Sequence, residues 1–213
     1  MIEQIYNLKP NSIYDVVDKS FFIEKDMNYD YLPPNCFDYY EIYYALSKYY
    51  QPKSILEIGV RYGYSLYSMV CGSDVIENVA GYDLEETLNG YHLPNNLNYH
   101  NKSKFEIVQE NFDLFCNKKI NLNLKYVNTQ KINELNDYYD LIHIDGDHSI
   151  EGKLHDLEIT KNKCKVVIID DYALHSNVRQ GVDIFLNNNQ NSFKNVYFVN
   201  SRNLINNHCI IEY

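Results

Sequence analysis

Short apolar runs alternate with stretches of helical spacing through most of the chain. Runs rich in Ile, Val and Leu predict strands, at residues 54–58, 78–83, 122–127, 139–144 and 166–169. Between them apolar residues recur every three or four positions, which predicts helices, at residues 38–50, from Gly63 to about residue 71, and at 105–115, 151–162 and 178–187. The tail adds two strand-like runs, residues 196–199 and 204–211.

This alternation predicts a parallel sheet with helices on both faces, because parallel neighbours need a crossover connection. We expect an α/β, Rossmann-like, doubly wound fold with a mostly parallel seven-stranded sheet and an antiparallel C-terminal strand. No linker or repeat interrupts the pattern, so residues 36–213 are expected to form a single domain. Residues 1–35, which include Pro10 and the pair Pro33 and Pro34, are expected to form an irregular N-terminal cap.

The composition argues against several classes of function. The chain has 213 residues, a net charge of -10 and no basic patch, so we expect no nucleic-acid partner. Its five cysteines are scattered and form no CxxC pair, which favours reduced thiols over disulfides or a zinc knuckle. The first residues do not resemble a signal peptide, and no apolar run approaches ~20 residues. We therefore expect a cytoplasmic protein with no membrane partner.

A glycine turn follows the first predicted strand. Residues 56–65 are Leu-Glu-Ile-Gly-Val-Arg-Tyr-Gly-Tyr-Ser, so Gly59 comes directly after the strand and Gly63 opens the next helix. A glycine there lets a ligand approach the backbone, because no side chain stands in the way. A dinucleotide site would have a second glycine two residues after Gly59, but that position is Arg61. The turn therefore suits a small ligand better than a pyrophosphate.

The spacing E-x-G-x-x-x-G-x-S of this turn resembles that of class I methyltransferases. The resemblance is closest to the catechol O-methyltransferase type and to the macrocin- and mycinamicin-type sugar O-methyltransferases. It implies S-adenosylmethionine as the cofactor, with Glu57 and Ser65 by its methionine part and Gly59 by its sulfur side. The other turn residues expected to bind the cofactor are Arg61, Tyr62 and Gly63.

Asp83 ends the second predicted strand, where a carboxylate can accept hydrogen bonds from both ribose hydroxyls of a nucleoside. A lone glycine turn is often only structural, but Asp83 at the next strand end favours a cofactor site. In the resembling family the adenine is flanked by residues just after the third strand. Asn128, Thr129 and Gln130 occupy that place here. Asp145, after the fourth strand, completes the expected cofactor-binding set.

Carboxylates gather at two further strand ends. Asp145 follows the fourth predicted strand, and Asp170 and Asp171 follow the fifth. Neighbouring parallel strands lie about 4.8 Å apart, so these side chains should meet at the edge where open α/β sheets bind ligands. Three carboxylates repel one another unless a cation is present, and oxygen ligands suit Mg²⁺. The sequence predicts a magnesium site here, although such acids also cap helices.

Three histidines lie near these strand ends. His148, three residues after Asp145, is predicted to be a general base, because an imidazole pKa of about 6.5 suits proton transfer near neutral pH. Asp145 is expected to take part in catalysis with it. A purely structural role for His148 stays open. His143, inside the fourth strand, is expected to be a core histidine, and His175 is a candidate for the pocket wall.

A second resemblance covers the strand ends. Residues 141–149, Leu-Ile-His-Ile-Asp-Gly-Asp-His-Ser, and residues 167–172, Val-Ile-Ile-Asp-Asp-Tyr, resemble the cephalosporin-hydroxylase-like group, also called methyltransferase domain 24. The likeness covers about residues 53–188. It implies a metal held by an Asp after strand four and an acidic pair after strand five, which here are Asp145, Asp170 and Asp171. The base position of the catechol type falls on His148, where that type has a lysine.

The resemblance implies an S-adenosylmethionine-dependent, Mg²⁺-dependent O-methyltransferase acting on a small molecule. We expect the acceptor to be a hydroxyl of a sugar or nucleotide-sugar, with a small aromatic diol as the alternative. A non-catalytic cofactor-binding module and a nucleotide-dependent oxidoreductase are alternatives of other classes, and Arg61 argues against the latter. The tail strands leave a homodimer open. Residues 1–35 and 84–103 are expected to shape the acceptor pocket.

Overall fold

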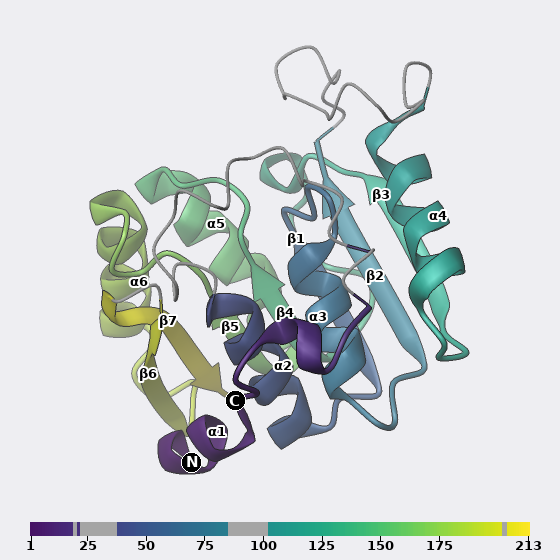
Figure 1. Cartoon of the computed structure of the whole chain (residues 1–213). Helices are drawn as coiled ribbons and strands as arrows, with labels where there is room; N and C mark the ends of the chain where they lie inside the picture. The colour runs from purple at the N-terminus through teal and green to yellow at the C-terminus, as the bar shows by residue number, and fades with distance from the viewer. Residues whose placement is uncertain (19–20, 22–37, 85–101, 202–203) are drawn as a thin grey trace.

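The structure of the chain is a computed structural model that describes residues 1–18, 21, 38–84, 102–201 and 204–213 (Figure 1). The strands are β1 (Ser54–Ile58), β2 (Asn78–Asp83), β3 (Asn121–Tyr126), β4 (Tyr139–Ile144), β5 (Cys164–Ile169), β6 (Asn195–Ser201) and β7 (Leu204–Glu212). The helices are α1 (Ile2–Leu8), α2 (Asp38–Tyr50), α3 (Tyr64–Gly72), α4 (Lys104–Phe115), α5 (Ile150–Thr160) and α6 (Ser176–Asn188), with 3₁₀ turns η1 (Ile13–Asp15) and η4 (Thr129–Lys131).

The strands form a seven-stranded sheet in the order β3-β2-β1-β4-β5-β7-β6. Strands β1 to β5 pair in parallel, and β7 runs antiparallel to both β5 and β6. The predicted fold class, including the antiparallel C-terminal strand, is confirmed. The order reverses between β1 and β4, and ligands of open α/β sheets bind at the carboxyl ends of strands at such a point. Strand β6 lies at one edge of the sheet, and the homodimer stays a prediction.

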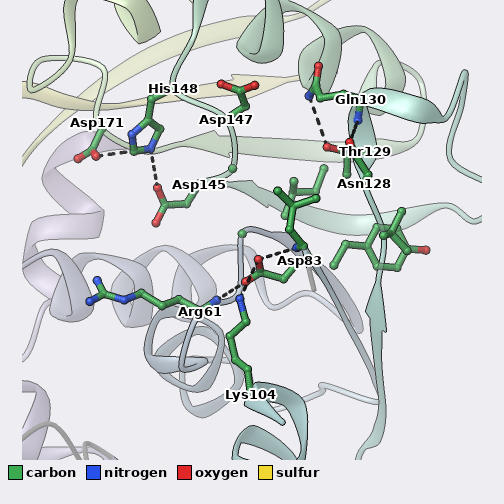
Figure 2. Close-up of a pocket in the computed structure, with 16 residues that line it drawn as sticks. Arg61, Asp83, Lys104, Asn128, Thr129, Gln130, Asp145, Asp147, His148 and Asp171 are labelled. Carbon is green, nitrogen blue, oxygen red and sulfur yellow. Dashed lines mark hydrogen bonds and ion pairs between the residues drawn. The ribbon is translucent and has the colours of Figure 1, made fainter. Parts of the chain in front are cut away.

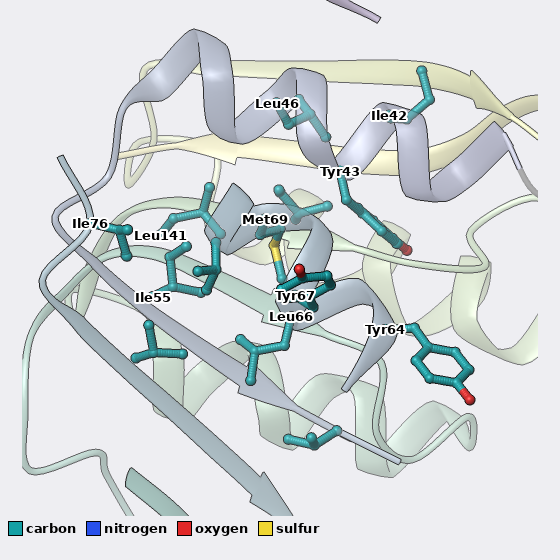
Figure 3. Packing of buried hydrophobic residues seen from close by; sticks show 14 of the residues in the cluster. Ile42, Tyr43, Leu46, Ile55, Tyr64, Leu66, Tyr67, Met69, Ile76 and Leu141 are labelled. Atoms are coloured by element: carbon teal, nitrogen blue, oxygen red, sulfur yellow. The ribbon is translucent and has the colours of Figure 1, made fainter. Parts of the chain in front are cut away.

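The sheet divides the hydrophobic core into two layers, because successive side chains of a strand point to opposite faces. On one face Ile55, Leu141 and Ile168 pack beneath α2, α3 and α4, and Figure 3 shows part of this cluster. On the other face Leu56 and Ile142 pack against α5 and α6. Strands β1, β4 and β5 are thus covered on both sides, as the apolar sequences of β4 and β5 predict.

The N-terminal residues are more regular than the sequence indicates. The expectation of an irregular segment is wrong for Ile2–Leu8, which forms α1 and buries Ile5 in the same core layer as α2. The backbone N–H of Ile13 also donates to Glu41 Oε1 of α2, at 2.8 Å. A seven-residue helix is too short to be stable alone, so packing rather than local sequence decides its formation. The predicted boundary at residue 35 lies outside the described residues.

Other expectations concern the remaining described parts of the chain. No described helix has both the length and the apolar character needed to cross a membrane. The described cysteines have free thiols, as expected: Cys71, Cys116, Cys164 and Cys209. Most of the segment expected to shape an acceptor pocket, residues 85–101, lies outside the described residues.

Asp140 joins the start of β1 to β4 and β5. Its Oδ2 accepts hydrogen bonds from the backbone N–H groups of Lys53 (2.8 Å) and Ser54 (3.2 Å), and its Oδ1 lies 2.6 Å from Lys165 Nζ. Burial alone would raise the pKa of Asp140, but the hydrogen bonds from Lys165 and Lys53 hold it below its usual value. Because the folded pKa is depressed, this carboxylate stabilises the fold above its unfolded pKa of about 3.9, and that contribution falls as the pH drops.

We predict that Asp140→Asn lowers the free energy of unfolding at pH 7 by about 1–2 kcal/mol, since it weakens hydrogen bonds to a charged acceptor. Urea unfolding from pH 7 to pH 3 should show the difference from wild type shrinking as Asp140 becomes protonated. Asp137→Asn, at an exposed neighbouring carboxylate, is the control and should change stability little. A difference that stays constant down to pH 3 would contradict this account.

Candidate functional site

A cavity of about 680 Å³ opens at the carboxyl ends of β1, β2 and β4 (Figure 2). Six segments contribute to its wall: the glycine turn, the end of β2, the start of α4, the turn η4, the loop after β4 and the loop after β5. Its lining residues are Ile58, Gly59, Arg61, Tyr82, Asp83, Leu84, Lys104, Val127, Asn128, Thr129, Gln130, Asp145, Gly146, Asp147, His148 and Asp171. The cavity lies at the point where the strand order reverses, and its volume is typical of a small-molecule site.

The glycine turn packs directly on the loop after β4. Gly59 has a φ of +92°, and a Cβ placed there would lie 2.1 Å from the carbonyl oxygen of Asp145. No other residue fits this close approach. Gly63, with a φ of +75°, is the N-cap of α3, and Arg61 between them also has a positive φ, of 47°. The turn thus brings bare backbone to the cavity wall beside Asp145.

Asp83 is held by two hydrogen bonds and one ion pair. Its Oδ2 accepts from the backbone N–H of Arg61 (2.7 Å), and its Oδ1 accepts from the backbone N–H of Leu84 (2.7 Å) and lies 3.0 Å from Lys104 Nζ. A carboxylate has about four acceptor positions, so the two hydrogen bonds leave about half of them beside the Lys104 ion pair. The two ribose hydrogen bonds that the sequence predicts for Asp83 stay a prediction.

Glu57 and Ser65 do not line the cavity, and neither do Tyr62 and Gly63. Glu57 is fully buried, where its Oε1 accepts from Ser65 Oγ (2.5 Å) and lies 2.7 Å from His143 Nδ1. Burial alone would lower the pKa of His143, but its hydrogen bond to Glu57 outweighs burial and raises that pKa. His143 is thus the core histidine that the sequence predicts. Through Glu57 and Ser65 these hydrogen bonds join the two ends of the glycine turn.

The turn η4 is fastened to helix α5. Asp156 Oδ1 accepts hydrogen bonds from Thr129 Oγ1 (2.8 Å) and Gln130 Nε2 (2.9 Å). His155 Nε2 lies 2.9 Å from the carbonyl oxygen of Thr129. These contacts fix the wall that the sequence assigns to the adenine. They engage the side chains of Thr129 and Gln130, and Asn128 Oδ1 accepts a hydrogen bond from the backbone N–H of Gln130 at 3.0 Å.

The acids of β4 and β5 meet as predicted. Asp145, Asp170 and Asp171 each offer an oxygen within 4.8 Å of the others. Asp171 has a φ of +59°, an unfavourable conformation for a residue with a side chain and one that clusters at functional sites. Asp145 and Asp171 line the cavity, whereas Asp170 is 2% exposed, outside the lining and 2.9 Å from His208 Nδ1.

His148 lies between the two lining acids (Figure 2). Its Nε2 is 3.3 Å from Asp145 Oδ1 and 3.9 Å from Asp171 Oδ2, and the side chain is 39% exposed. The hydrogen bond to Asp145 raises the pKa of His148. The predicted base is therefore at the cavity wall, next to the predicted metal ligands. His175 does not line the cavity, but its ring stacks on that of His148, with centroids 4.7 Å apart.

Lys153 is a buried amine close to these acids. It is fully buried on α5, and within the described part of the chain its Nζ has no hydrogen-bond partner. Burial lowers the pKa of Lys153, while the nearby carboxylates favour its charged form; they are Asp145, Asp156, Asp170 and Asp171. Its stem packs on Gly181 of α6, where a Cβ would lie 3.1 Å from Lys153 Cβ.

Three contributors to the site escape the sequence pattern: Lys104, Lys153 and Asp156. Lys104 lies just before a predicted helix and Lys153 lies within one, and charged residues at such places are usually solvated. Their roles depend on partners distant in the sequence, such as Asp83 for Lys104 and Thr129 for Asp156. For Asp156 a weak signal existed, since it falls within the stretch that resembles the methyltransferase family.

Comparison with known proteins gives one family match. The family model described as a methyltransferase domain matches residues 56–172, from β1 to the residue after Asp171. The match therefore spans the glycine turn, Asp83 and the acids of β4 and β5. None of the curated proteins matches the chain significantly.

Several solved structures are similar to the chain. An O-methyltransferase from Bacillus cereus in complex with SAH has a TM-score of 0.59 at 17% identity and covers 100% of both chains. The O-methyltransferase TomG from Streptomyces achromogenes, in complex with SAM, has a TM-score of 0.56 at 14% identity, covering 100% of this chain and 99% of its own. The O-methyltransferase NovP has a TM-score of 0.56 at 16% identity, covering 82% and 78%. At these identities the likeness establishes the fold.

Proposed function

The chain belongs to the methyltransferase-domain family, and we propose that it moves a methyl group from S-adenosylmethionine to a hydroxyl oxygen of a small molecule. One observation carries the proposal. A single cavity is lined on one side by the glycine turn, Asp83 and η4, and on the other by Asp145, His148 and Asp171. A nucleoside-type donor and a hydroxyl-bearing acceptor could therefore lie side by side. The structures similar to the chain include three named as O-methyltransferases.

The donor side fits S-adenosylmethionine. The bare backbone at Gly59 admits a ligand closely, and the remaining acceptor positions of Asp83 suit ribose hydroxyls. The η4 wall, fixed by Asp156, would flank the adenine. Glu57 and Ser65 would act indirectly, by holding the turn from beneath. When bound, the cofactor would supply an electrophilic methyl group on a sulfonium.

The acid side fits a divalent cation. Carboxylate oxygens of Asp145, Asp170 and Asp171 lie close enough to share one ion, and hard oxygen donors suit Mg²⁺. A bound cation would supply charge that lowers the pKa of an acceptor hydroxyl. The residues themselves orient the acceptor at the cavity wall, beside the backbone of Gly59.

His148 would be the general base. In the neutral imidazole that carries its proton on Nδ1, Nε2 would accept the hydroxyl proton while the C–S bond of the donor breaks and the new O–CH₃ bond forms. S-adenosylhomocysteine, the methylated acceptor and protonated His148 are the products. Transfer is an in-line displacement, so alignment within the cavity would supply much of the rate.

The acceptor we propose is a hydroxyl of a sugar or nucleotide-sugar. The lining residues of the acid side among those described are polar or glycine: Asp145, Gly146, Asp147, His148 and Asp171. Such a wall offers hydrogen bonds to a polyol and no aliphatic surface for a flat ring. A small aromatic diol is the alternative, because two adjacent hydroxyls could share one cation.

Calorimetry tests the cofactor. We expect micromolar binding of S-adenosylhomocysteine and no measurable binding of NAD, because the second glycine of a pyrophosphate turn is Arg61. Tight NAD binding without S-adenosylhomocysteine binding would refute the proposal.

Methyl transfer from labelled donor to a panel of nucleotide sugars and catechols then identifies the acceptor, and methylation of catechols alone would reject the sugar.

Asp171→Asn tests the cation. We predict that kcat falls about 10²-fold or more, because the variant removes one charged ligand where charge develops in the reaction. EDTA should abolish wild-type turnover, and Mg²⁺ should restore it. Asp113→Asn, an exposed change on α4, is the control. Full activity in Asp171→Asn, or in the presence of EDTA, would remove the metal from the mechanism.

His148→Ala tests the base. We predict a fall in kcat of about 10²–10⁴-fold, the usual contribution of general-base catalysis, with little change in the affinity for S-adenosylhomocysteine. Stopped assays with saturating donor measure the first quantity and calorimetry the second. A loss below about tenfold would assign the proton to another acceptor.

A further inference from the structure

Two imidazoles and one carboxylate meet beside the acid cluster. His175 Nε2 lies 3.4 Å from Asp171 Oδ2, and His148 Nε2 lies 3.9 Å from the same oxygen. The donor atoms of these three residues all lie within 4.8 Å of one another. The set shares Asp171 with the three carboxylates, but its other two donors are nitrogen.

The spacing fits one small cation. Ligands about 2.1 Å from a metal are about 3.4 Å apart in a tetrahedron and about 3.0 Å apart at a right angle. The distance from His175 Nε2 to Asp171 Oδ2 is 3.4 Å, equal to the first value, and the distance from His148 Nε2 is 3.9 Å, about 0.5 Å longer. Two imidazoles on one ion would place their ring centres about 5.3 Å apart in a tetrahedron and about 4.6 Å apart at a right angle. The centroids of His148 and His175 are 4.7 Å apart.

The side chain of His175 does not cap the helix that it precedes. It is the N-cap of α6, yet its side chain makes no capping hydrogen bond, although capping is the usual role of a residue there. Instead its Nε2 is directed at Asp171. The side chains of His148 and His175 are 39% and 45% exposed, so an ion can reach them from solvent, while Asp171 is 7% exposed.

We propose that His148, Asp171 and His175 bind a transition-metal ion of the zinc type, at a position that adjoins the carboxylate set. Imidazole nitrogen favours Zn²⁺, Co²⁺ and Ni²⁺, whereas Mg²⁺ favours oxygen. Binding itself does not depend on methyl transfer. Its consequence does rest on the proposed function: an ion on Nε2 of His148 takes the lone pair that would accept the hydroxyl proton, so Zn²⁺ inhibits the reaction.

Calorimetric titration of the full chain with ZnCl₂ and with MgCl₂ tests the site, without donor or acceptor. We expect one Zn²⁺ per chain in wild type. His175→Ala should weaken Zn²⁺ binding at least about tenfold, since even residues that only support metal ligands contribute 10- to 100-fold. Mg²⁺ affinity should change less than about twofold. The matched control is Asn177→Ala, an exposed change in the same turn of α6 that should leave both affinities unchanged.

Thermal melts establish that His175→Ala folds, which its exposed, non-capping position favours. Equal Zn²⁺ affinity in wild type and His175→Ala would overturn the proposal. So would loss of Zn²⁺ binding in Cys71→Ser but not in His175→Ala, since the ion would then be on a thiol. Titration with CoCl₂ separates these cases, because a thiolate ligand adds an intense near-ultraviolet band that nitrogen and oxygen ligands lack.

Inhibition of methyl transfer by Zn²⁺ is measured separately from Zn²⁺ binding. If the chain methylates an acceptor, Zn²⁺ should inhibit wild type at concentrations at least about tenfold lower than it inhibits His175→Ala. The binding titration and this assay can fail separately, so a wrong assignment of the reaction would leave the metal result intact.

Discussion

The gathering of like charges at one sheet edge is the constraint on which the site depends. The parallel pairing of β4 and β5 brings Asp145, Asp170 and Asp171 together, and burial makes their mutual repulsion costly. Three nitrogen-bearing side chains lie around these carboxylates. Lys153 is buried and interacts electrostatically with all three carboxylates. His208 lies against Asp170, and His148 lies between Asp145 and Asp171. The close carboxylate oxygens are the feature from which the proposed cation site is argued.

A second constraint links this edge to the donor side of the cavity. The backbone of Gly59 lies against the carbonyl group of Asp145, and the N–H of Asp145 donates to the carbonyl oxygen of Ile58 at 2.8 Å. The two halves of the cavity therefore share one rigid wall. Any ligand in the glycine turn is held at a fixed distance from the acids. Such a linkage is what a reaction between two bound molecules requires, since small displacements are costly to its rate.

Helix α5 serves both halves. Asp156 fixes the η4 wall, and Lys153, on the preceding turn of the helix, faces the acids. Because α5 begins directly after the loop that carries Asp145 and His148, its position is determined by the same short segment. One helix thus contacts both η4, the wall assigned to the adenine, and the carboxylates after β4 and β5. This explains why two charged residues of a helix are fully buried.

The sequence by itself determined the strands, the glycine turn and the strand-end acids. Each depends on a local pattern: apolar runs such as Val166–Ile169, the left-handed turn at Gly59, and Asp145 directly after β4. The parallel pairing of the strands then brings those acids to one edge of the sheet. The sequence pattern did not reveal α1, because this short helix depends on packing against α2.

Only the tertiary structure decided which side chains face the cavity. Glu57 and Ser65 are joined by a hydrogen bond away from the cavity, and Asp83 is held by two backbone N–H groups and the ion pair with Lys104. The strands and α4 bring these groups together from distant parts of the chain. The roles of Lys153 and His175 also come from tertiary packing. The physical reason is that hydrogen bonds and charges act over a few ångströms in space, whatever the separation along the sequence.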